Sequence, residues 1–146
     1  MARTERRIAV VDDDTGACTA MLRFLRACGM RVEGYSSAEA FLAAGACEQF
    51  DCLILDVCLP GMSGLELQRA LAKRGPVPPA IMVSAHDDPH TREAALRQGA
   101  VEFFGKTDTG DSLIDAIERH VPLRTGPRVT RGTVRAVAAP FAVAKR

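Results

Sequence analysis

Several polar side chains that could hold a metal ion and a phosphoryl group follow short apolar runs of this sequence. They are the triplet Asp12-Asp13-Asp14, Asp56, Ser84 and Lys106. Carboxylates held close together repel one another, so their pKa values rise unless a cation compensates. A set of oxygen ligands favours a hard ion, and Mg²⁺ uses one or two carboxylates while it keeps several waters. A nearby hydroxyl and ammonium would stabilise the negative charge of a phosphoryl group.

Asp56 is the best candidate for a nucleophile in such a site. It stands alone at the end of an apolar run, and Pro60-Gly61 soon turns the chain away. Aspartates can form acyl phosphates. The simpler explanation of an aspartate after a strand is a helix cap, and we expect that role for Asp14. The joint occurrence of carboxylates, a hydroxyl and a lysine after separate runs favours phosphoryl chemistry over capping alone.

Other chemistries lack their motifs in this chain. No G-x-G-x-x-G or Walker-type loop occurs, which disfavours binding of a dinucleotide or ATP. Ser84 has no G-x-S-x-G context, so a hydrolase triad is not expected.

A regular alternation of strands and helices must position these residues. Short strand-like runs occur at residues 7–11, 31–35, 52–55, 80–83 and 101–104. Three of them are continuously apolar, which is typical of strands covered on both faces. Stretches with helical spacing lie within residues 18–28, 36–42, 67–71, 88–98 and 113–121. Gly29 and Gly99 suit the positions just past the first and fourth helices.

Two of these helices carry more specific expectations. The segment Ser36-Ser37-Ala38-Glu39 has the sequence of a capping box, with Phe41 and Leu42 on the buried side. The fourth helix offers only the run Ala94-Ala95-Leu96 as an apolar contact with the sheet. Such a thin contact suits an element that moves.

A strand followed by a helix, repeated over about 115 residues, predicts an α/β domain. We expect one doubly wound, five-stranded parallel sheet with helices on both faces, because parallel strands need right-handed crossovers. Ligands bind at the carboxyl ends of the strands in such sheets. We assign residues 1–121 to this domain and residues 122–146 to a tail, since prolines and glycines break the pattern there.

The composition agrees with one globular domain. The chain has 146 residues, of which 47% are hydrophobic and 25% are charged. It has no apolar run near the roughly 20 residues of a membrane helix. The start also lacks the long apolar core of a secretory signal, so we expect a cytoplasmic protein. Five cysteines without a C-x-x-C pair favour reduced, mostly buried thiols.

The charge is distributed unevenly along the chain. The net charge is +1, yet residues 122–146 carry six basic and no acidic side chains, which leaves −5 on residues 1–121. An acidic domain disfavours nucleic-acid binding by that domain. We expect the tail to be a solvated, disordered end. There are two alternatives. The tail could be a segment that docks a partner or touches nucleic acid, or it could be the remnant of a lost output domain.

The sequence from about residue 7 to 121 resembles the receiver domain of two-component response regulators. Its motifs are IAVVDDD, LILDVCLPGMSGLEL, VSAH and GAVEFFGK, in that order. The SSAEAFL segment is similar to receivers of the FixJ type, which usually precede a helix-turn-helix output domain. The resemblance implies a flavodoxin-like (βα)5 fold with strand order 2-1-3-4-5. Because only 25 residues follow residue 121, we expect a single-domain regulator without an output domain.

The resemblance also implies a Mg²⁺-dependent phosphorelay. Asp56 would accept a phosphoryl group from the phosphohistidine of a sensor histidine kinase or a histidine phosphotransfer protein. Asp13, Asp56 and the backbone carbonyl of Cys58 would ligate Mg²⁺, with Asp12 acting through water. The protein would turn over only its own phosphate, so we do not expect an enzyme.

The same resemblance implies a switch. Ser84 and Lys106 would contact the phosphoryl oxygens, Ser84 would move toward them, and Phe103 would fill the vacated space. The face formed by the fourth helix, the fifth strand and the fifth helix would then change and bind a downstream protein. Cys58 and His86 occupy positions that tune the lifetime of the acyl phosphate. We expect a monomer or a phosphorylation-dependent dimer that makes no contact with a membrane.

Thr107 stands where the family usually has a proline. A cis bond before a non-proline residue costs about 3–4 kcal/mol, so we predict a trans Lys106–Thr107 bond and an altered loop. This departure supports an alternative, a receiver-like interaction module that works without phosphorylation.

Another alternative is a Mg²⁺ phosphatase that forms an aspartyl phosphate. Such enzymes generally carry a second acid two residues after the nucleophile, where this chain has Cys58.

Overall fold

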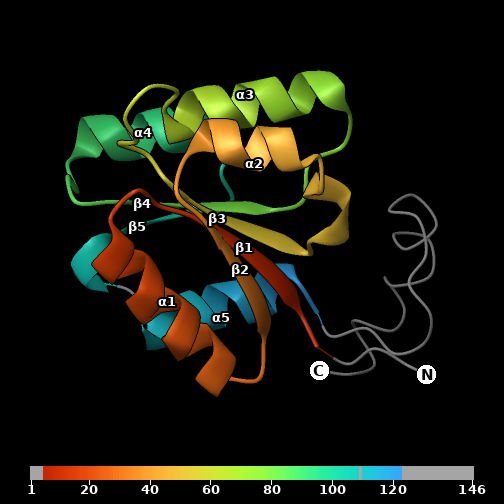
Figure 1. Ribbon diagram of the computed structural model, residues 1–146. Coiled ribbons are helices and arrows are strands. Elements are labelled where there is room, and N and C mark those ends of the chain that lie inside the picture. The colour runs from red at the N-terminus through yellow and green to blue at the C-terminus, as the bar shows by residue number, and fades with distance from the viewer. Residues whose placement is uncertain (1–4, 109, 123–146) are drawn as a thin grey trace.

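The computed structural model describes residues 5–108 and 110–122, in which strands and helices alternate (Figure 1). The elements are β1 (Arg7–Val11), α1 (Thr15–Ala27), β2 (Arg31–Tyr35), α2 (Ala38–Ala44), β3 (Cys52–Asp56), α3 (Gly64–Arg74), β4 (Ala80–Ser84), α4 (Pro89–Arg97), β5 (Glu102–Gly105) and α5 (Asp111–His120). Short 3₁₀ helices at Cys47–Gln49 and Lys106–Asp108 precede β3 and follow β5. Apart from Pro122, the predicted tail lies outside the described residues. Among the described helices, none combines the length and the apolar character that a bilayer crossing requires.

The strands form one parallel sheet in the order β2-β1-β3-β4-β5. The predicted α/β class and the strand order that the resemblance implied are both confirmed. The register places the strand ends at one edge, because Val11 is opposite Leu55 and Ser84 is opposite Gly105. β3 and β4 each run one residue further than predicted, so that Asp56 and Ser84 are their last residues.

Helices cover both faces of the sheet (Figure 1). α2, α3 and α4 pack on one face, and α1 and α5 pack on the other. The alternation of side chains along each strand divides the core. Ala9 and Val11 of β1 face the first layer, whereas Ile8 and Val10 face the second. All residues of β3 and β4 are buried, as the continuous apolar runs predicted.

The N-terminus of α2 differs from the predicted capping box. Ser37, and not Ser36, is the N-cap residue, and its side chain accepts a hydrogen bond from the Ala40 N–H at 3.0 Å. Glu39 therefore lies one position too early in the helix to bond back to the cap. Its carboxylate instead accepts a hydrogen bond from the Met62 N–H at 2.9 Å, in the loop after β3. The prediction of a capping box at Ser36 and Glu39 is wrong.

A capping box does form at α3. The Ser63 side chain accepts a hydrogen bond from the Glu66 N–H at 3.1 Å, and the Glu66 carboxylate accepts one from the Ser63 N–H at 2.9 Å. This cap explains why α3 begins at Gly64, three residues before the predicted start.

α4 has even less apolar contact with the sheet than predicted. Of the residues expected to pack, only Ala95 is fully buried, while Leu96 is 46% exposed. A helix turns by about 100° per residue, so Leu96 points away when Ala95 points inward. The prediction that Leu96 packs against the sheet is wrong.

The five cysteines are free thiols, as predicted. Cys18 and Cys52 are buried, and burial raises the pKa of Cys52 to about 12. Cys28 and Cys58 are exposed and Cys47 is half-buried. The prediction of mostly buried thiols is therefore wrong, because Cys28 is the exposed C-cap residue of α1 and Cys58 lies in the loop after β3.

Candidate functional site

The carboxyl ends of β1 and β3 bring three aspartates together. Asp12 and Asp13 directly follow β1, and Asp56 ends β3. One carboxylate oxygen from each lies within 4.8 Å of the others. Asp12 and Asp56 are buried, whereas Asp13 is exposed. This set of oxygen ligands, open to solvent on one side, fits a hard divalent cation such as Mg²⁺.

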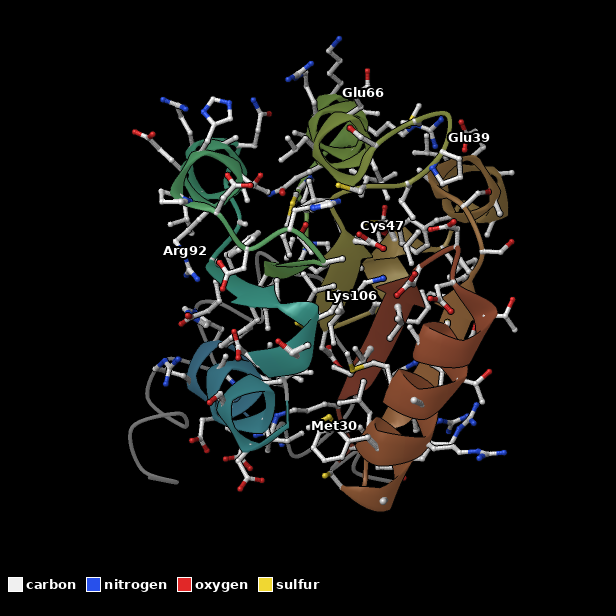
Figure 2. The ribbon with its side chains drawn as sticks, turned by 90° about the vertical axis from the view of Figure 1, so that its left-hand side faces the viewer. Met30, Glu39, Cys47, Glu66, Arg92 and Lys106 are labelled. Carbon is white, nitrogen blue, oxygen red and sulfur yellow. The ribbon has the colours of Figure 1, made fainter. Side chains whose placement is uncertain are left out.

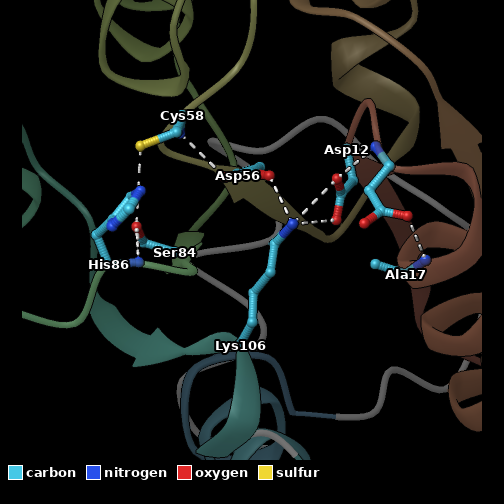
Figure 3. Close-up of polar contacts among 8 residues, drawn as sticks. Asp12, Ala17, Asp56, Cys58, Ser84, His86 and Lys106 are labelled. Carbon is cyan, nitrogen blue, oxygen red and sulfur yellow. Dashed lines mark hydrogen bonds and ion pairs between the residues drawn. The ribbon is translucent and has the colours of Figure 1, made fainter.

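Lys106 reaches from the end of β5 to two of these aspartates (Figure 3). Its Nζ lies 2.8 Å from Asp56 Oδ2 and 3.1 Å from Asp12 Oδ2. Burial disfavours the charged ammonium, but hydrogen bonds to Asp56 and Asp12 outweigh burial and raise the pKa of Lys106 above its usual value. Lys106 is therefore a permanent positive charge between two buried carboxylates.

The Asp56 carboxylate has a second partner in the loop that follows β3. Its Oδ1 accepts a hydrogen bond from the Cys58 N–H at 3.0 Å. Burial raises the pKa of Asp56, while the hydrogen bonds from Lys106 and Cys58 act in the opposite direction. Burial has the larger effect, so the pKa of Asp56 lies above its usual value. A further positive charge nearby would therefore stabilise the charged carboxylate.

Asp14 has the structural role that was predicted for it. Its Oδ1 accepts a hydrogen bond from the Ala17 N–H at 3.0 Å and caps α1. The Asp14 N–H in turn donates to Asp12 Oδ1 at 2.9 Å. The start of α1 therefore fixes the orientation of the Asp12 carboxylate beside Lys106.

Gly64 allows the chain to turn tightly behind Asp56. A β-carbon at Gly64 would lie only 2.2 Å from the Asp56 carbonyl oxygen, which no packing can accommodate. The Gly64 N–H donates a hydrogen bond to the Val57 carbonyl at 3.1 Å. Gly64 was not among the predicted site residues, and its one signal in the sequence is its place three residues before the predicted third helix.

Ser84, Cys58 and His86 lie on the opposite side of Asp56 from Asp12 (Figure 3). Ser84 is fully buried, and its hydroxyl oxygen accepts a hydrogen bond from the His86 N–H at 3.0 Å. The same oxygen lies 4.0 Å from Cys58 Sγ. The two residues expected to tune the phosphate lifetime therefore both adjoin the Ser84 hydroxyl, and both are exposed.

Phe103 is buried on the face of the sheet that α4 covers, with 3% of its surface exposed. The guanidinium carbon of Arg92 lies 4.9 Å from the centroid of its ring. Arg92 was not among the residues predicted to matter, because an arginine on an exposed helix gives no signal in the sequence.

The peptide bond after Lys106 has the predicted geometry. The Lys106–Thr107 bond is trans, since the described residues contain no cis peptide bond. Residues Lys106–Asp108 form a 3₁₀ turn, so the site lysine begins a short helix.

Comparison with known proteins agrees with this geometry. Residues 8–118 match the response regulator receiver domain family. The chain is 40% identical over 119 residues to the response regulator protein TmoT of Ectopseudomonas mendocina, a match that covers 82% of this chain and 54% of that protein. It is 34% identical over 110 residues to the transcriptional regulatory protein FixJ of Azorhizobium caulinodans, covering 75% of this chain and 52% of that protein.

Solved structures show the same relationship. The crystal structure of FixJ-N superposes with a TM-score of 0.72 at 32% identity, covering 81% of this chain and 94% of that chain. The response regulator StyR gives a TM-score of 0.73 at 33% identity, covering 97% of this chain and 68% of that chain. The chain spans about half the length of the curated relatives it matches. On the match over residues 8–118 and these identities, the chain belongs to the response regulator receiver domain family.

Proposed function

We propose that this protein accepts a phosphoryl group on Asp56 from a histidine kinase or a histidine phosphotransfer protein. The observation that best supports the proposal is the Lys106 ammonium, 2.8 Å from Asp56 Oδ2 within a cluster of three carboxylates. An ion pair that served stability alone would not need two further carboxylates beside it, because their repulsion costs free energy. Membership of the receiver family gives the arrangement its signalling context.

The proposed transfer of the phosphoryl group is a displacement at phosphorus. A carboxylate oxygen of Asp56 attacks the phosphorus of the phosphohistidine, and the P–O bond forms as the P–N bond breaks. The electron pair of the broken bond leaves with the imidazole, which takes up a proton. Lys106 and Ser84 donate hydrogen bonds to the phosphoryl oxygens and stabilise their negative charge.

We assign Mg²⁺ to Asp13, Asp56 and the backbone carbonyl of Cys58, with Asp12 acting through water. The mutual distances within 4.8 Å and the oxygen donors support this assignment. When bound, Mg²⁺ supplies positive charge that reduces repulsion between the carboxylates and an incoming phosphoryl group. The upward pKa direction of Asp56 supports the same requirement for a cation.

We further propose that Ser84 and Phe103 convert phosphorylation into a change of the α4-β5-α5 face. The Ser84 hydroxyl has the His86 N–H as a partner at 3.0 Å. Turning toward a phosphoryl group would exchange that hydrogen bond for a stronger, charge-assisted one. The α4-β5-α5 face would then bind a downstream protein, and Cys58 and His86 would set how quickly water removes the phosphate.

The decisive experiment is incubation with Mg²⁺ and a small phosphodonor such as acetyl phosphate, followed by measurement of the intact mass. We expect one added phosphoryl group, which is absent in Asp56→Asn and without Mg²⁺. Asp115→Asn is the control, because Asp115 is an exposed residue of α5 outside the site. Transfer from a phosphorylated histidine phosphotransfer protein should depend on Asp56 in the same way.

The alternatives give different outcomes. No added mass in the wild-type protein would favour an interaction module that works without phosphorylation. Continuous release of phosphate from many substrates would favour a phosphatase. An added group that persists in Asp56→Asn would overturn the choice of Asp56 as acceptor.

A further inference from the structure

Arg92 connects α4 to two parts of the site that the proposed mechanism moves. Its Nη2 lies 2.9 Å from Asp87 Oδ1, in the loop that begins after Ser84. Its Nη1 donates a hydrogen bond to the Phe103 carbonyl at 3.3 Å. The guanidinium carbon lies 4.9 Å from the centroid of the Phe103 ring, within the range of a cation–π contact. Figure 2 shows Arg92 on the α4 side of the domain, beside β5.

The loop held by Arg92 packs closely against the end of β5. A β-carbon at Gly105 would lie 3.1 Å from the Asp87 β-carbon and 3.2 Å from Asp87 Oδ2. Gly105 is the residue directly before Lys106. Asp87 is therefore in contact with the backbone that carries the site lysine, and Arg92 binds Asp87 from the outside.

The rest of α4 has few anchors. Ala95 is its one buried residue, and Asp88 caps the helix through the Thr91 N–H at 2.8 Å. The planar guanidinium of Arg92 joins α4 to β5 through the Phe103 carbonyl and to the preceding loop through Asp87.

Arg92 also lies on the same stripe of α4 as the exposed Leu96. The two residues are four positions apart, which places them on one face of the helix. Both line a shallow surface depression of about 500 Å³, together with Pro89, Glu93 and Arg97. A displacement of Arg92 would therefore change the surface around Leu96.

We infer that Arg92 is a positioning residue that couples the Ser84–Asp87 loop and the Phe103 ring to the Leu96 face of α4. The inference rests on the proposed function, since it assigns to Arg92 the link between Asp56 and the surface of α4. Any movement of Asp87, in the loop after Ser84, or of Phe103 must carry the Arg92 contacts with it or break them. Either outcome transmits the state of the site to α4.

The test compares three variants with the wild-type protein by NMR. Arg92→Gln removes both the positive charge and the planar guanidinium group, whereas Arg92→Lys keeps the positive charge without the guanidinium. Arg97→Gln is the matched control, because Arg97 lies on the same helix and its one ion pair with a described residue is a 3.8 Å pair with Glu93. Amide hydrogen exchange of α4 is measured without ligand. Amide shifts of Cys58 and Leu96 are then measured with Mg²⁺ and beryllofluoride, a mimic of the phosphoryl group.

We expect Arg92→Gln to speed amide exchange in α4 about fivefold, whereas Arg97→Gln leaves it unchanged. Beryllofluoride should still shift the Cys58 amide in Arg92→Gln, while the shift at Leu96 falls by about half or more. Arg92→Lys should restore part of the Leu96 shift, which a general loss of stability would not allow. A full Leu96 shift in Arg92→Gln, or an equal loss in Arg97→Gln, would overturn the inference. If beryllofluoride does not shift the Cys58 amide of the wild-type protein, the proposed function fails. In that case the positioning role of Arg92 is judged from amide hydrogen exchange in α4, and unchanged exchange in Arg92→Gln would overturn that role as well.

Discussion

Lys106 and Asp56 form an ion pair of 2.8 Å across the end of β4, which separates their strands in the sheet. The same ammonium lies 3.1 Å from Asp12. Within residues 5–108 and 110–122, one ammonium therefore faces a cluster that contains three carboxylates. Because negative charge exceeds positive charge in this cluster, the stability of the fold should depend on Lys106, on the charge of Asp56 and on added cations.

Lys106→Met should lower the free energy of unfolding at pH 7 by about 1–3 kcal/mol, because it leaves two buried carboxylates without their ammonium. The loss is smaller than for a fully buried pair, since the Lys106 side chain is 24% exposed. Millimolar Mg²⁺ should stabilise the variant more than the wild-type protein, because the metal replaces the missing charge. Urea unfolding with and without Mg²⁺ measures both effects.

Lys73→Met is the control for this experiment. Lys73 is an exposed residue in the last turn of α3, at the opposite end of that helix from Gly64, which contacts Asp56. We expect little change in its stability or its response to Mg²⁺. Equal losses in the two variants would show that the Lys106 ion pair does not stabilise the fold.

Asp56→Asn should raise the free energy of unfolding at pH 7, by on the order of 1 kcal/mol. Burial raises the pKa of Asp56 in the folded protein above its value in the unfolded chain. Between those two pKa values the folded protein binds more protons, so its stability falls as pH rises through that window. The advantage of the variant should therefore shrink as the pH falls toward about 4. Urea unfolding at several pH values would contradict this if the variant were less stable at pH 7.

Gly64→Ala should destabilise the protein by about 2–4 kcal/mol, because the new β-carbon would collide with the Asp56 carbonyl oxygen at 2.2 Å. It should also reduce phosphorylation, since the collision displaces the backbone that carries Asp56. Gly16→Ala in α1 is the control, because the nearest described side-chain atom to its β-carbon would be Asp14 Oδ1, at an ordinary 3.5 Å. That substitution should be neutral or stabilising by about 0.5–1 kcal/mol. Similar thermal unfolding of the two variants would refute the proposed close contact.

Glu102→Gln should cost about 0.5 kcal/mol at pH 7. Hydrogen bonds from Arg119 at 2.8 Å and His120 at 3.1 Å lower the pKa of Glu102. The stabilisation is therefore complete above the ordinary pKa of a glutamate and is lost as the pH falls through the lower pKa of the folded state. Unfolding curves of variant and wild type should converge at acidic pH. Glu93→Gln, which among the described residues loses one exposed 3.8 Å pair with Arg97, should show no such pH-dependent difference.

Local patterns in the sequence were sufficient to predict the strands and the chemistry at their ends. Strands that are buried on both faces must be continuously apolar, so the runs before Asp56 and Ser84 could be identified without any tertiary information. The glycines after α1 and α4 were also identified, and both have the positive φ that ends a helix. Hydrophobic periodicity could not predict the order of the strands in the sheet. That order came from the family resemblance.

The wrong capping box and the two omitted residues involve contacts between segments that are distant in the chain. Glu39 bonds to the Met62 N–H instead of its own helix cap, and Gly64 is required because the Asp56 carbonyl lies against it. Arg92 reaches Phe103 on another element. No local pattern reports such partners, because each depends on how a helix is placed over the sheet.

The sequence by itself determined which residues carry charge, which segments form strands and helices, and that Asp12, Asp56, Ser84 and Lys106 follow or end strands. Only the tertiary structure decided that Lys106 spans one strand to reach Asp56, and that Arg92 joins α4 to β5. The physical reason is that distances between elements are set by close packing of the whole core, to which residues far apart in the chain contribute together.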